Sequence, residues 1–201
     1  MAVPVAGALL RRLAVPAPAG PRPVSEIAAE ISDGLLDRWE RLGHPFHRRL
    51  VDQARDLAGG LSHRTGSLLV NHDLHYDNVL AADREPWLAI DPKVVTGDPE
   101  YQVAQLLWTR LDEMDGREEL FFHAHALIES AELDPEVANA WTVVRCIDYW
   151  LWGLDSGFTE ARLRRGLRLS ARSRSRAPSA GELSRRRTAL RPFQVSRARA
   201  S

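Results

Sequence analysis

Two carboxylates and one amide stand at spacings suited to phosphate chemistry. Asp73 and Asn78 are separated by four residues, and Asp91 follows a stretch over residues 79–90 that reads as a β-hairpin. If that stretch folds back on itself, Asp91 returns beside Asn78. Carboxylate and amide oxygens are hard ligands that suit Mg²⁺, and kinases use an Asp, an Asn and a later Asp in this order. The pattern therefore predicts a site for phosphoryl transfer.

The same segments resemble the aminoglycoside phosphotransferases, in particular the streptomycin 6-kinase and hydroxyurea-resistance branch. The likeness lies in the loop Asn-His-Asp-Leu-His-Tyr-Asp-Asn at 71–78, in Ile-Asp-Pro-Lys at 90–93, in Val-Thr-Gly-Asp-Pro-Glu-Tyr at 95–101 and in helical stretches at 106–113 and 148–154. It implies an α+β, mainly α fold, the C-terminal lobe of the protein-kinase-like fold. It also implies ATP as phosphate donor, Mg²⁺ as cofactor and a small-molecule aminoglycoside as acceptor.

The resemblance assigns a role to each matching residue. Asp73 is the expected general base, which orients and deprotonates the acceptor hydroxyl. Asn78 and Asp91 are the expected ligands of Mg²⁺ against the ATP phosphates, and His75 is expected to support the loop. Asp77 stands where the family has a small residue and is expected to be exposed.

Three positions depart from the family pattern. Asn71 replaces a histidine, His72 replaces a glycine and Gln102 replaces an acid. A histidine in place of glycine puts a bulky side chain, and potentially forbidden backbone angles, next to the expected base. Each departure is expected to lower activity without changing the fold.

Acidic residues point to a cationic acceptor. Asp112 and Glu113 follow the helical stretch at 106–111, and Asp148 lies on an aromatic-rich helix. These three are candidate substrate contacts, because a negative pocket steers a polycation inward. Solvated acidic faces are the alternative interpretation for any one of them.

The nucleotide side of a kinase is missing from the sequence pattern. The chain has no Gly-x-Gly, and its single lysine, Lys93, lies too close to Asp91 to serve as the phosphate-binding lysine of another lobe. We therefore expect the small N-terminal lobe to be absent, unless a partner supplies it. The isolated chain is expected to be truncated and weakly active or inactive.

The elements expected around the site are mainly helices. Residues 1–24 read as a proline-rich linker or extension, residues 25–169 as the kinase-like lobe and residues 170–201 as a basic disordered tail. Helices are expected at 25–42, at 46–57 (closed by Gly59-Gly60), from 101 to 111, at 117–132 and at 135–154. A short strand is expected at 67–70.

Charge and composition narrow the class of protein. Residues 162–201 hold 13 arginines and one glutamate, so the remainder, with 14 basic and 26 acidic residues, is acidic. The basic tail lacks interleaved aromatics, which disfavours nucleic-acid binding. One cysteine excludes an internal disulfide, no apolar run is long enough to cross a membrane, and a cytoplasmic setting is expected.

Three alternatives stay open. The chain could be a non-catalytic kinase-lobe remnant that binds a partner or nothing. It could be a kinase for another small molecule, such as hydroxyurea, choline or homoserine, with the aromatic helix forming a cation box. A metal-dependent phosphohydrolase built on His72-Asp73 is the third, and it needs further His and Asp ligands from surrounding helices.

Overall fold

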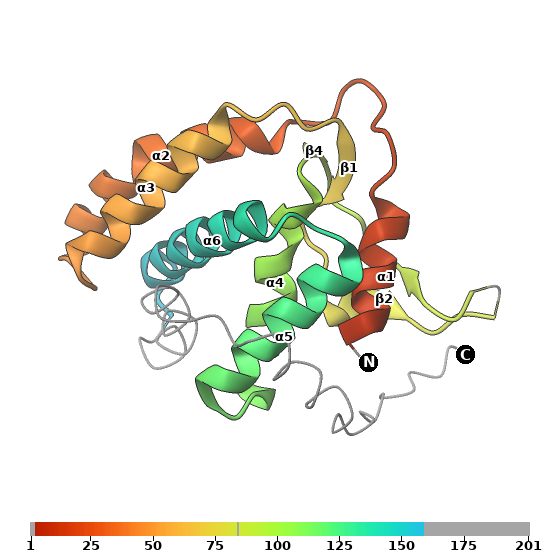
Figure 1. Cartoon of the computed structure of the whole chain (residues 1–201). Helices are drawn as coiled ribbons and strands as arrows, with labels where there is room; N and C mark the ends of the chain where they lie inside the picture. The colour runs from red at the N-terminus through yellow and green to blue at the C-terminus, as the bar shows by residue number, and fades with distance from the viewer. Residues whose placement is uncertain (1–2, 84, 159–201) are drawn as a thin grey trace.

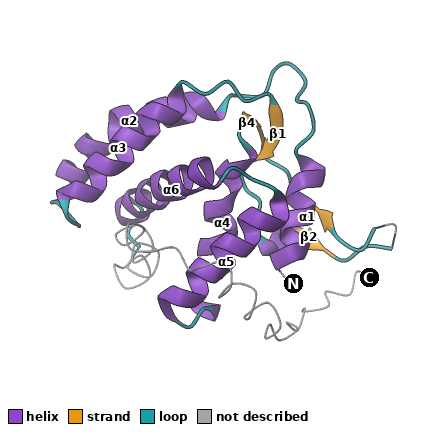
Figure 2. Ribbon diagram, viewed as in Figure 1, coloured by secondary structure: helices purple, strands orange, loops and turns teal. Residues whose placement is uncertain are grey.

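Helices make up most of the part of the chain that the structure describes, and four short strands lie at one side of them (Figures 1 and 2). The computed structural model describes residues 3–83 and 85–158. The helices are α1 (Val3–Leu13), α2 (Val24–Arg41), α3 (Arg48–Ser62), α4 (Val103–Trp108), α5 (Gly116–Ala131) and α6 (Pro135–Asp155), with 3₁₀ turns η1 (Tyr76–Asn78), η2 (Pro99–Gln102) and η3 (Leu111–Glu113). The mainly helical α+β composition is confirmed, and the expected tail at 170–201 lies outside the described residues.

The strands form two separate ribbons. Strand β1 (Leu68–Asn71) pairs antiparallel with β4 (Val94–Gly97), with Asn71 opposite Val94. Strand β2 (Val79–Leu80) pairs antiparallel with β3 (Leu88–Ala89), which confirms the hairpin expected between residues 79 and 90. The β1–β4 ribbon was not predicted.

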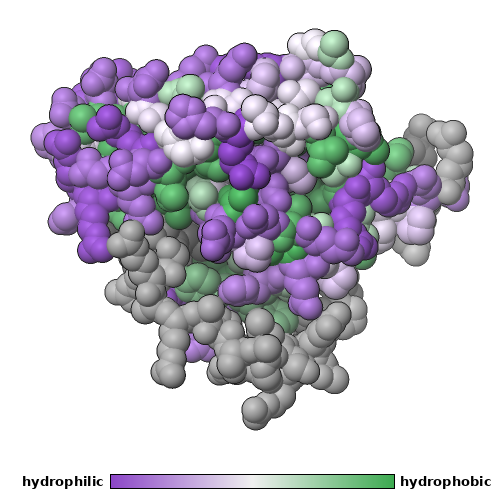
Figure 3. All heavy atoms as spheres, turned by 45° about the horizontal axis from the view of Figure 1, so that its top comes forward, coloured by the Kyte–Doolittle hydropathy of each residue, from purple (hydrophilic) through white to green (hydrophobic). Residues whose placement is uncertain are grey.

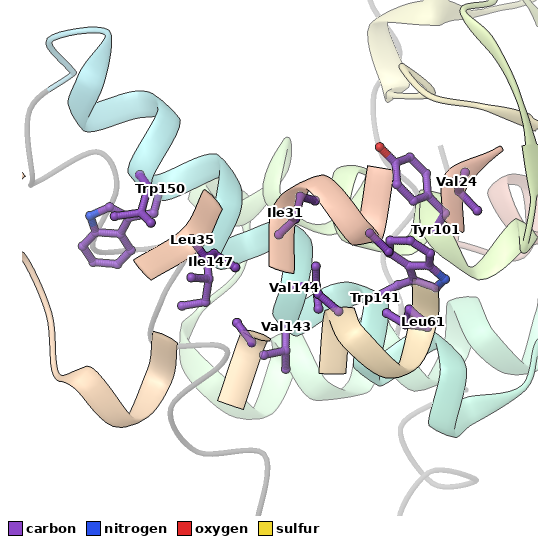
Figure 4. Close-up of a cluster of buried hydrophobic side chains, with 14 of the residues drawn as sticks. Val24, Ile31, Leu35, Leu61, Tyr101, Trp141, Val143, Val144, Ile147 and Trp150 are labelled. Carbon is purple, nitrogen blue, oxygen red and sulfur yellow. The ribbon is translucent and has the colours of Figure 1, made fainter. Parts of the chain in front are cut away.

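Helix α6 is the centre of the fold. Helices α2 and α3 lie side by side along one flank of α6 (Figure 1). Helix α4 packs on another side of α6, and α5 packs on α4. The first core cluster fills the space between α2, α3, α6 and the β1–β4 ribbon, as Figure 4 shows for side chains such as Ile31, Leu35, Leu61, Trp141 and Ile147. Trp141 and Trp150 of α6 are buried in it, whereas Trp152 of the same helix is 49% exposed.

The first 24 residues are not a simple linker. The structure places an amphipathic helix, α1, at Val3–Leu13, with Leu9 and Leu10 buried against α5. Gly7 permits this packing, because a Cβ there would lie 2.7 Å from Cβ of Ser130. This helix was not predicted, because it forms through tertiary burial of one apolar face, which its alanine- and proline-containing sequence does not reveal.

The proline-containing stretch after α1 is extended, as expected. Pro16 bridges to Leu68 at the β1 edge, and Pro23 bridges to Thr96 at the β4 edge. The amide of Leu69 donates to the carbonyl of Val15 at 2.7 Å, and that of Thr96 donates to the carbonyl of Arg22 at 2.9 Å. This segment therefore flanks both edges of the ribbon that leads into the site.

Helix α3 runs past the expected stop at Gly59-Gly60 and ends at Ser62. Ala58 and Leu61 are buried in the first core cluster on either side of the glycine pair. Burial of these side chains outweighs the intrinsic cost of glycine in a helix, which is about 1 kcal/mol per residue. None of the helices in residues 3–83 and 85–158 is long and apolar enough to cross a membrane.

Candidate active site

The loop that carries Asp73 is anchored at both ends. It leaves β1 at Asn71, turns through η1 and enters β2 at Val79. Leu74, next to Asp73, is only 1% exposed. It packs in a second cluster of buried apolar side chains, to which α1, α4 and α5 also contribute. Burial of a leucine side chain is worth about 2 kcal/mol, so the loop is fixed directly beside its expected base.

Two donors hold the carboxylate of Asp73 from different elements. Nε2 of Gln105 on α4 donates to Oδ1 at 2.6 Å, and Nζ of Lys93 donates to Oδ2 at 2.5 Å. Burial by itself would raise the pKa of Asp73, but the hydrogen bonds from Lys93 and Gln105 outweigh it and hold that pKa below its ordinary value. Asp73 is therefore an ionised, oriented carboxylate at neutral pH.

Asn71 joins the two halves of the site. Its Oδ1 accepts the backbone N–H of Asp73 and the backbone N–H of Lys93, both at 3.1 Å. The backbone N–H of His72 donates to the carbonyl of Lys93 at 2.7 Å. The Asp73 loop and the segment that follows Asp91 are thus held together as one unit.

The departures from the family pattern are accommodated locally. His72 does not adopt a positive φ, since among the described non-glycine residues only His44, Asp91 and Glu132 do. The expectation of forbidden backbone angles at His72 was therefore wrong, and its Nδ1 lies 2.8 Å from the hydroxyl of Tyr101. Gln102 is buried, and its Oε1 accepts the backbone N–H of Asn71 at 3.1 Å.

The expected metal ligands lie next to each other in the hairpin. The backbone N–H of Ile90 donates to the carbonyl of Asn78 at 2.9 Å, which brings Asp91 back beside Asn78. Nδ2 of Asn78 donates to the carbonyl of Asp73 at 3.1 Å, and this hydrogen bond leaves Oδ1 of the same amide unused. Asp91 is exposed with φ of 49°, and it follows the hairpin directly.

This donor set fits Mg²⁺ better than it fits a closed metal cage. In residues 3–83 and 85–158, no group of three or more His, Cys, Asp or Glu side chains could hold a metal ion. Mg²⁺ is bound by one or two protein oxygens together with phosphates and water, which Asn78 and Asp91 could supply. The phosphohydrolase alternative needed such a cluster, and the described residues offer none to it.

A buried arginine lies behind the base. Arg145 on α6 is 7% exposed and donates to the carbonyl of Tyr101 and to Oε1 of Gln105, each at 3.0 Å. Its guanidinium carbon lies 4.1 Å from the ring centre of Tyr101 and 4.9 Å from that of Trp108. Because arginine has no acceptor, this contact fixes Oε1 of Gln105 toward Arg145 and its amide nitrogen toward Asp73.

The candidate substrate acids occupy two different settings. Glu113 in η3 forms an ion pair with Arg110, whose guanidinium carbon lies 4.5 Å from the ring centre of Tyr76 in η1, so this acid lies near the base loop. Asp112 belongs to the same 3₁₀ turn. Asp148 instead accepts a 2.5 Å hydrogen bond from Arg38, which ties α6 to α2.

The aromatic residues near Asp148 form a row of neighbouring rings. Trp108 and Tyr149 are stacked at 4.7 Å with 12° between their planes, and Tyr149 lies 5.4 Å from Trp152. Trp152 is 49% exposed and contacts Phe158 edge to face. Among these rings only Trp108 and Tyr149 stack face to face, since the planes of Tyr149 and Trp152 are tilted by 30°.

His75 and Asp77 complete the loop. Nδ1 of His75 is buried without a hydrogen-bond partner and lies 3.6 Å from Oδ2 of Asp77. The backbone carbonyl of His75 accepts the N–H of Asn78 at 3.0 Å. The side chain of Asp77 is 94% exposed, as expected.

Comparison with known families decides what this constellation belongs to. The family model described as aminoglycoside/hydroxyurea antibiotic resistance kinase matches residues 1–157. The chain belongs to this family. The resemblance seen in the loop at 71–78 is thereby confirmed.

Relatives of the resistance-kinase family support the same branch. The chain is 37% identical over 159 residues to a streptomycin 6-kinase of Streptomyces griseus, and 39% identical over 158 residues to a hydroxyurea phosphotransferase of Kitasatospora aureofaciens. The matches cover 77% and 76% of this chain but 52% and 44% of those proteins. The chain thus spans about half the length of the curated relatives it matches. No solved structure matches the chain.

Three residues of this candidate site were not predicted as parts of it. Lys93 was considered only as a nucleotide-binding lysine, and Gln105 and Arg145 were not considered. A weak signal existed for Gln105, since it is polar at a position where the 103–108 helix otherwise turns apolar residues inward. The signal for Arg145 was similar, a single cation on the apolar face of a long helix.

Proposed function

We propose that this chain is an aminoglycoside O-phosphotransferase of the streptomycin 6-kinase type, which transfers the γ-phosphate of ATP to a hydroxyl of the antibiotic. Residues 25–169 would form its kinase-like C-terminal lobe. The observation that carries the proposal is the junction at Asn71, whose Oδ1 accepts the N–H groups of both Asp73 and Lys93. This junction keeps the base loop beside the segment that bears Asp91, as phosphoryl transfer requires.

Asp73 would act as the base toward the acceptor. Its carboxylate is one-quarter exposed, so a substrate hydroxyl can reach it, and its lowered pKa keeps it ionised. A carboxylate in this state orients the hydroxyl and takes its proton as the bond to phosphorus forms. Gln105 holds the carboxylate from the buried side.

Asn78 and Asp91 would hold Mg²⁺ on the nucleotide side. The bound ion would supply charge neutralisation at the ATP phosphates. Leu80 and Leu88 are paired across the hairpin, and both are exposed, as is Ile90 next to Asp91. An apolar surface beside the metal ligands suits the base of a nucleotide. Figure 3 shows that apolar side chains also gather in patches between polar ones on the face drawn there.

The acceptor side would be lined by acids. Asp112 and Glu113 lie in η3, near the η1 turn of the base loop. Asp148 would join them only if a cationic group of the substrate replaced Arg38 as its partner. Negative charge here favours polycationic acceptors.

A hydroxyurea kinase is the second candidate function. One specific observation favours it, namely the 39% identity to a hydroxyurea phosphotransferase. Hydroxyurea is small and uncharged, so it would gain nothing from the acids of η3.

The test is transfer of radiolabelled phosphate from Mg·ATP by the purified 201-residue chain, with streptomycin and hydroxyurea as alternative acceptors. We expect weak transfer to streptomycin, because the chain spans about half the length of its curated relatives, and this transfer should fall at least about 10²-fold in Asp73→Asn. Asp77→Asn is the matched control, because it removes an exposed carboxylate of the same loop. Equal transfer by Asp73→Asn, or no transfer by a folded wild-type chain, would contradict the proposal, and transfer to hydroxyurea alone would favour the second candidate.

A further inference from the structure

Lys93 combines a fixed backbone with an accessible side chain. Its N–H donates to Oδ1 of Asn71 at 3.1 Å, and its carbonyl accepts from the N–H of His72 at 2.7 Å. Its side chain is 61% exposed, and Nζ reaches Oδ2 of Asp73. The hydrogen-bonded backbone of Lys93 therefore places its ammonium group at the solvent-exposed side of the Asp73 carboxylate.

The two partners of Asp73 differ in how firmly they are held. Gln105 is buried, and Arg145 fixes the orientation of its amide. The ammonium group of Lys93 is held only through its ion pair with Asp73, and exposed ion pairs of lysine contribute about 1 kcal/mol or less. An anion that binds beside Asp73 can therefore replace Asp73 as the partner of the Lys93 ammonium group, while the hydrogen bond from Gln105 to Asp73 stays intact.

Phosphoryl transfer needs cations close to the phosphoryl group, and Lys93 lies at the expected base. Negative charge spreads over the oxygens of the phosphoryl group as it moves, and cations that meet this charge account for much of the rate. Arg145 is buried and engaged with Tyr101 and Gln105, and Arg110 is paired with Glu113. Lys93 is the one lysine of the chain, and it already lies at the base.

We propose that Lys93 is a further catalytic residue, which leaves Asp73 when the nucleotide arrives and binds the phosphoryl group being transferred. The inference rests on the function proposed above. In the transfer, the acceptor oxygen bonds to the γ-phosphorus as the bond from that phosphorus to the bridging oxygen of ADP breaks. The hydroxyl proton passes to Asp73, and Lys93 neutralises the transferred group without changing its own bonds. Before nucleotide arrives, the same ammonium covers the base.

The single lysine permits a direct test. The folded chain is treated with an acetylating N-hydroxysuccinimide ester, and the acetylation rate of Lys93 is measured by peptide mass spectrometry. We expect saturating Mg·ATP to slow this rate at least about fivefold, and Mg·ADP to slow it less because it lacks the γ-phosphate. In Asp73→Asn the rate without nucleotide should rise, since the ion pair is lost, and Mg·ATP should still protect.

Arg41→Lys supplies a matched internal control. The Arg41 side chain is 59% exposed and is paired with Asp155, at 3.4 Å, at the far end of α2. A lysine there has a similar exposure and a similar partner, and Mg·ATP should leave its acetylation unchanged. Protection of both lysines would indicate a general effect of nucleotide and would overturn the proposal.

Calorimetric titration of the same chain with Mg·ATP separates the two hypotheses. If nucleotide binds and the acetylation of Lys93 does not change, the role of Lys93 is overturned and the proposed function stands. Equal protection by Mg·ADP would overturn the assignment to the transferred group. If no nucleotide binds, both fall. In the kinetic arm, Lys93→Gln should lower kcat about 10²-fold with little change in the KM of the acceptor.

Discussion

The side-chain amide of Gln105 donates a 2.6 Å hydrogen bond to Oδ1 of Asp73, while its oxygen accepts from the buried Arg145. The orientation of the carboxylate therefore depends on a residue of α4 and, through it, on one of α6. Gln105 therefore has two roles, namely packing against Arg145 and donation of a hydrogen bond to the base. A single substitution can distinguish them.

Gln105→Glu keeps the shape of the side chain and its contact with Arg145, but a carboxylate cannot donate to Asp73. We expect kcat for phosphate transfer to fall by about 10²-fold, since misplacement of a reacting group has costs of this size. The free energy of unfolding should change little, because the attraction of the new carboxylate to Arg145 opposes its repulsion from the carboxylate of Asp73. Steady-state kinetics and urea denaturation measure the two effects, with Gln53→Glu on α3 as the control. An unchanged kcat would show that Gln105 does not position the base.

Arg145→Met removes the cation behind the site and keeps most of its apolar volume. The carbonyl of Tyr101 and Oε1 of Gln105 lose their donor inside the core, and each unpaired buried group costs about 1–3 kcal/mol. We expect the free energy of unfolding to fall by about 2 kcal/mol in urea denaturation. Arg145→Lys should recover little of this, because an ammonium cannot reproduce the planar fork of donors. Full stability in either variant would contradict the prediction.

Substitution of Gly7 tests the packing of α1 against α5, and substitution of Gly60 on α3 provides the comparison. In Gly7→Ala the new Cβ would lie 2.7 Å from Cβ and 2.8 Å from the backbone carbon of Ser130, so α1 and α5 must separate. We expect a loss of about 1–2 kcal/mol. Gly60→Ala, on an exposed position of α3 with nothing within 4 Å of the new Cβ, should gain about 0.5–1 kcal/mol. Thermal denaturation of both variants would reveal whether α1 is an integral part of the fold, and equal effects would argue against it.

Glu100 gives the stability a pH dependence of known sign. Burial raises the pKa of this carboxyl, with the nearby Asp98 adding to the effect, and Oε1 accepts the backbone N–H of Asp134 at 3.0 Å. A raised pKa means that the folded state favours the protonated form, so the contribution is present below pH 4.5 and is lost as the pH rises through the folded-state pKa. Glu100→Gln keeps the acceptor oxygen and removes the buried charge.

We therefore expect Glu100→Gln to be more stable than the wild type at pH 8 and to lose that advantage as the pH falls toward 4.5. Urea denaturation of both proteins at several pH values measures the difference, which cancels the titration of the other carboxyl groups. A constant difference between the two proteins across this range would mean that Glu100 does not carry the pH dependence.

Much of the helical frame could be predicted, because local signals specify it. Helix α6 begins at Pro135 behind Asp134, whose side chain accepts from the N–H groups of Glu136 and Val137. The hairpin between residues 79 and 90 is a local pairing across a short turn, and it was predicted for the same reason. Helix α1 was missed because its stability lies in contacts with α5, more than 100 residues away in sequence.

The sequence predicted which residues the candidate site contains, but not the hydrogen bonds that hold its base in place. Asp73, Asn78 and Asp91 stand out in the sequence because their spacing is local. The contact of Lys93 with Asp73 depends on the pairing of β1 with β4, and that of Gln105 depends on how α4 docks. Such long-range contacts leave no periodicity in the sequence. The roles of the three residues stay predictions.

The pairing of Asn71 with Val94 has a consequence for proteolysis. A lysine-specific protease finds one bond to cut in this chain, between Lys93 and Val94. A protease cleaves an extended segment freed from its ladder, so cutting requires the β1–β4 ribbon to open locally. Each cleavage event therefore counts an opening of the site itself. The single cut would leave Asp73 on one fragment and Gln105 with Arg145 on the other. The rate of this cleavage therefore measures how often the candidate site opens.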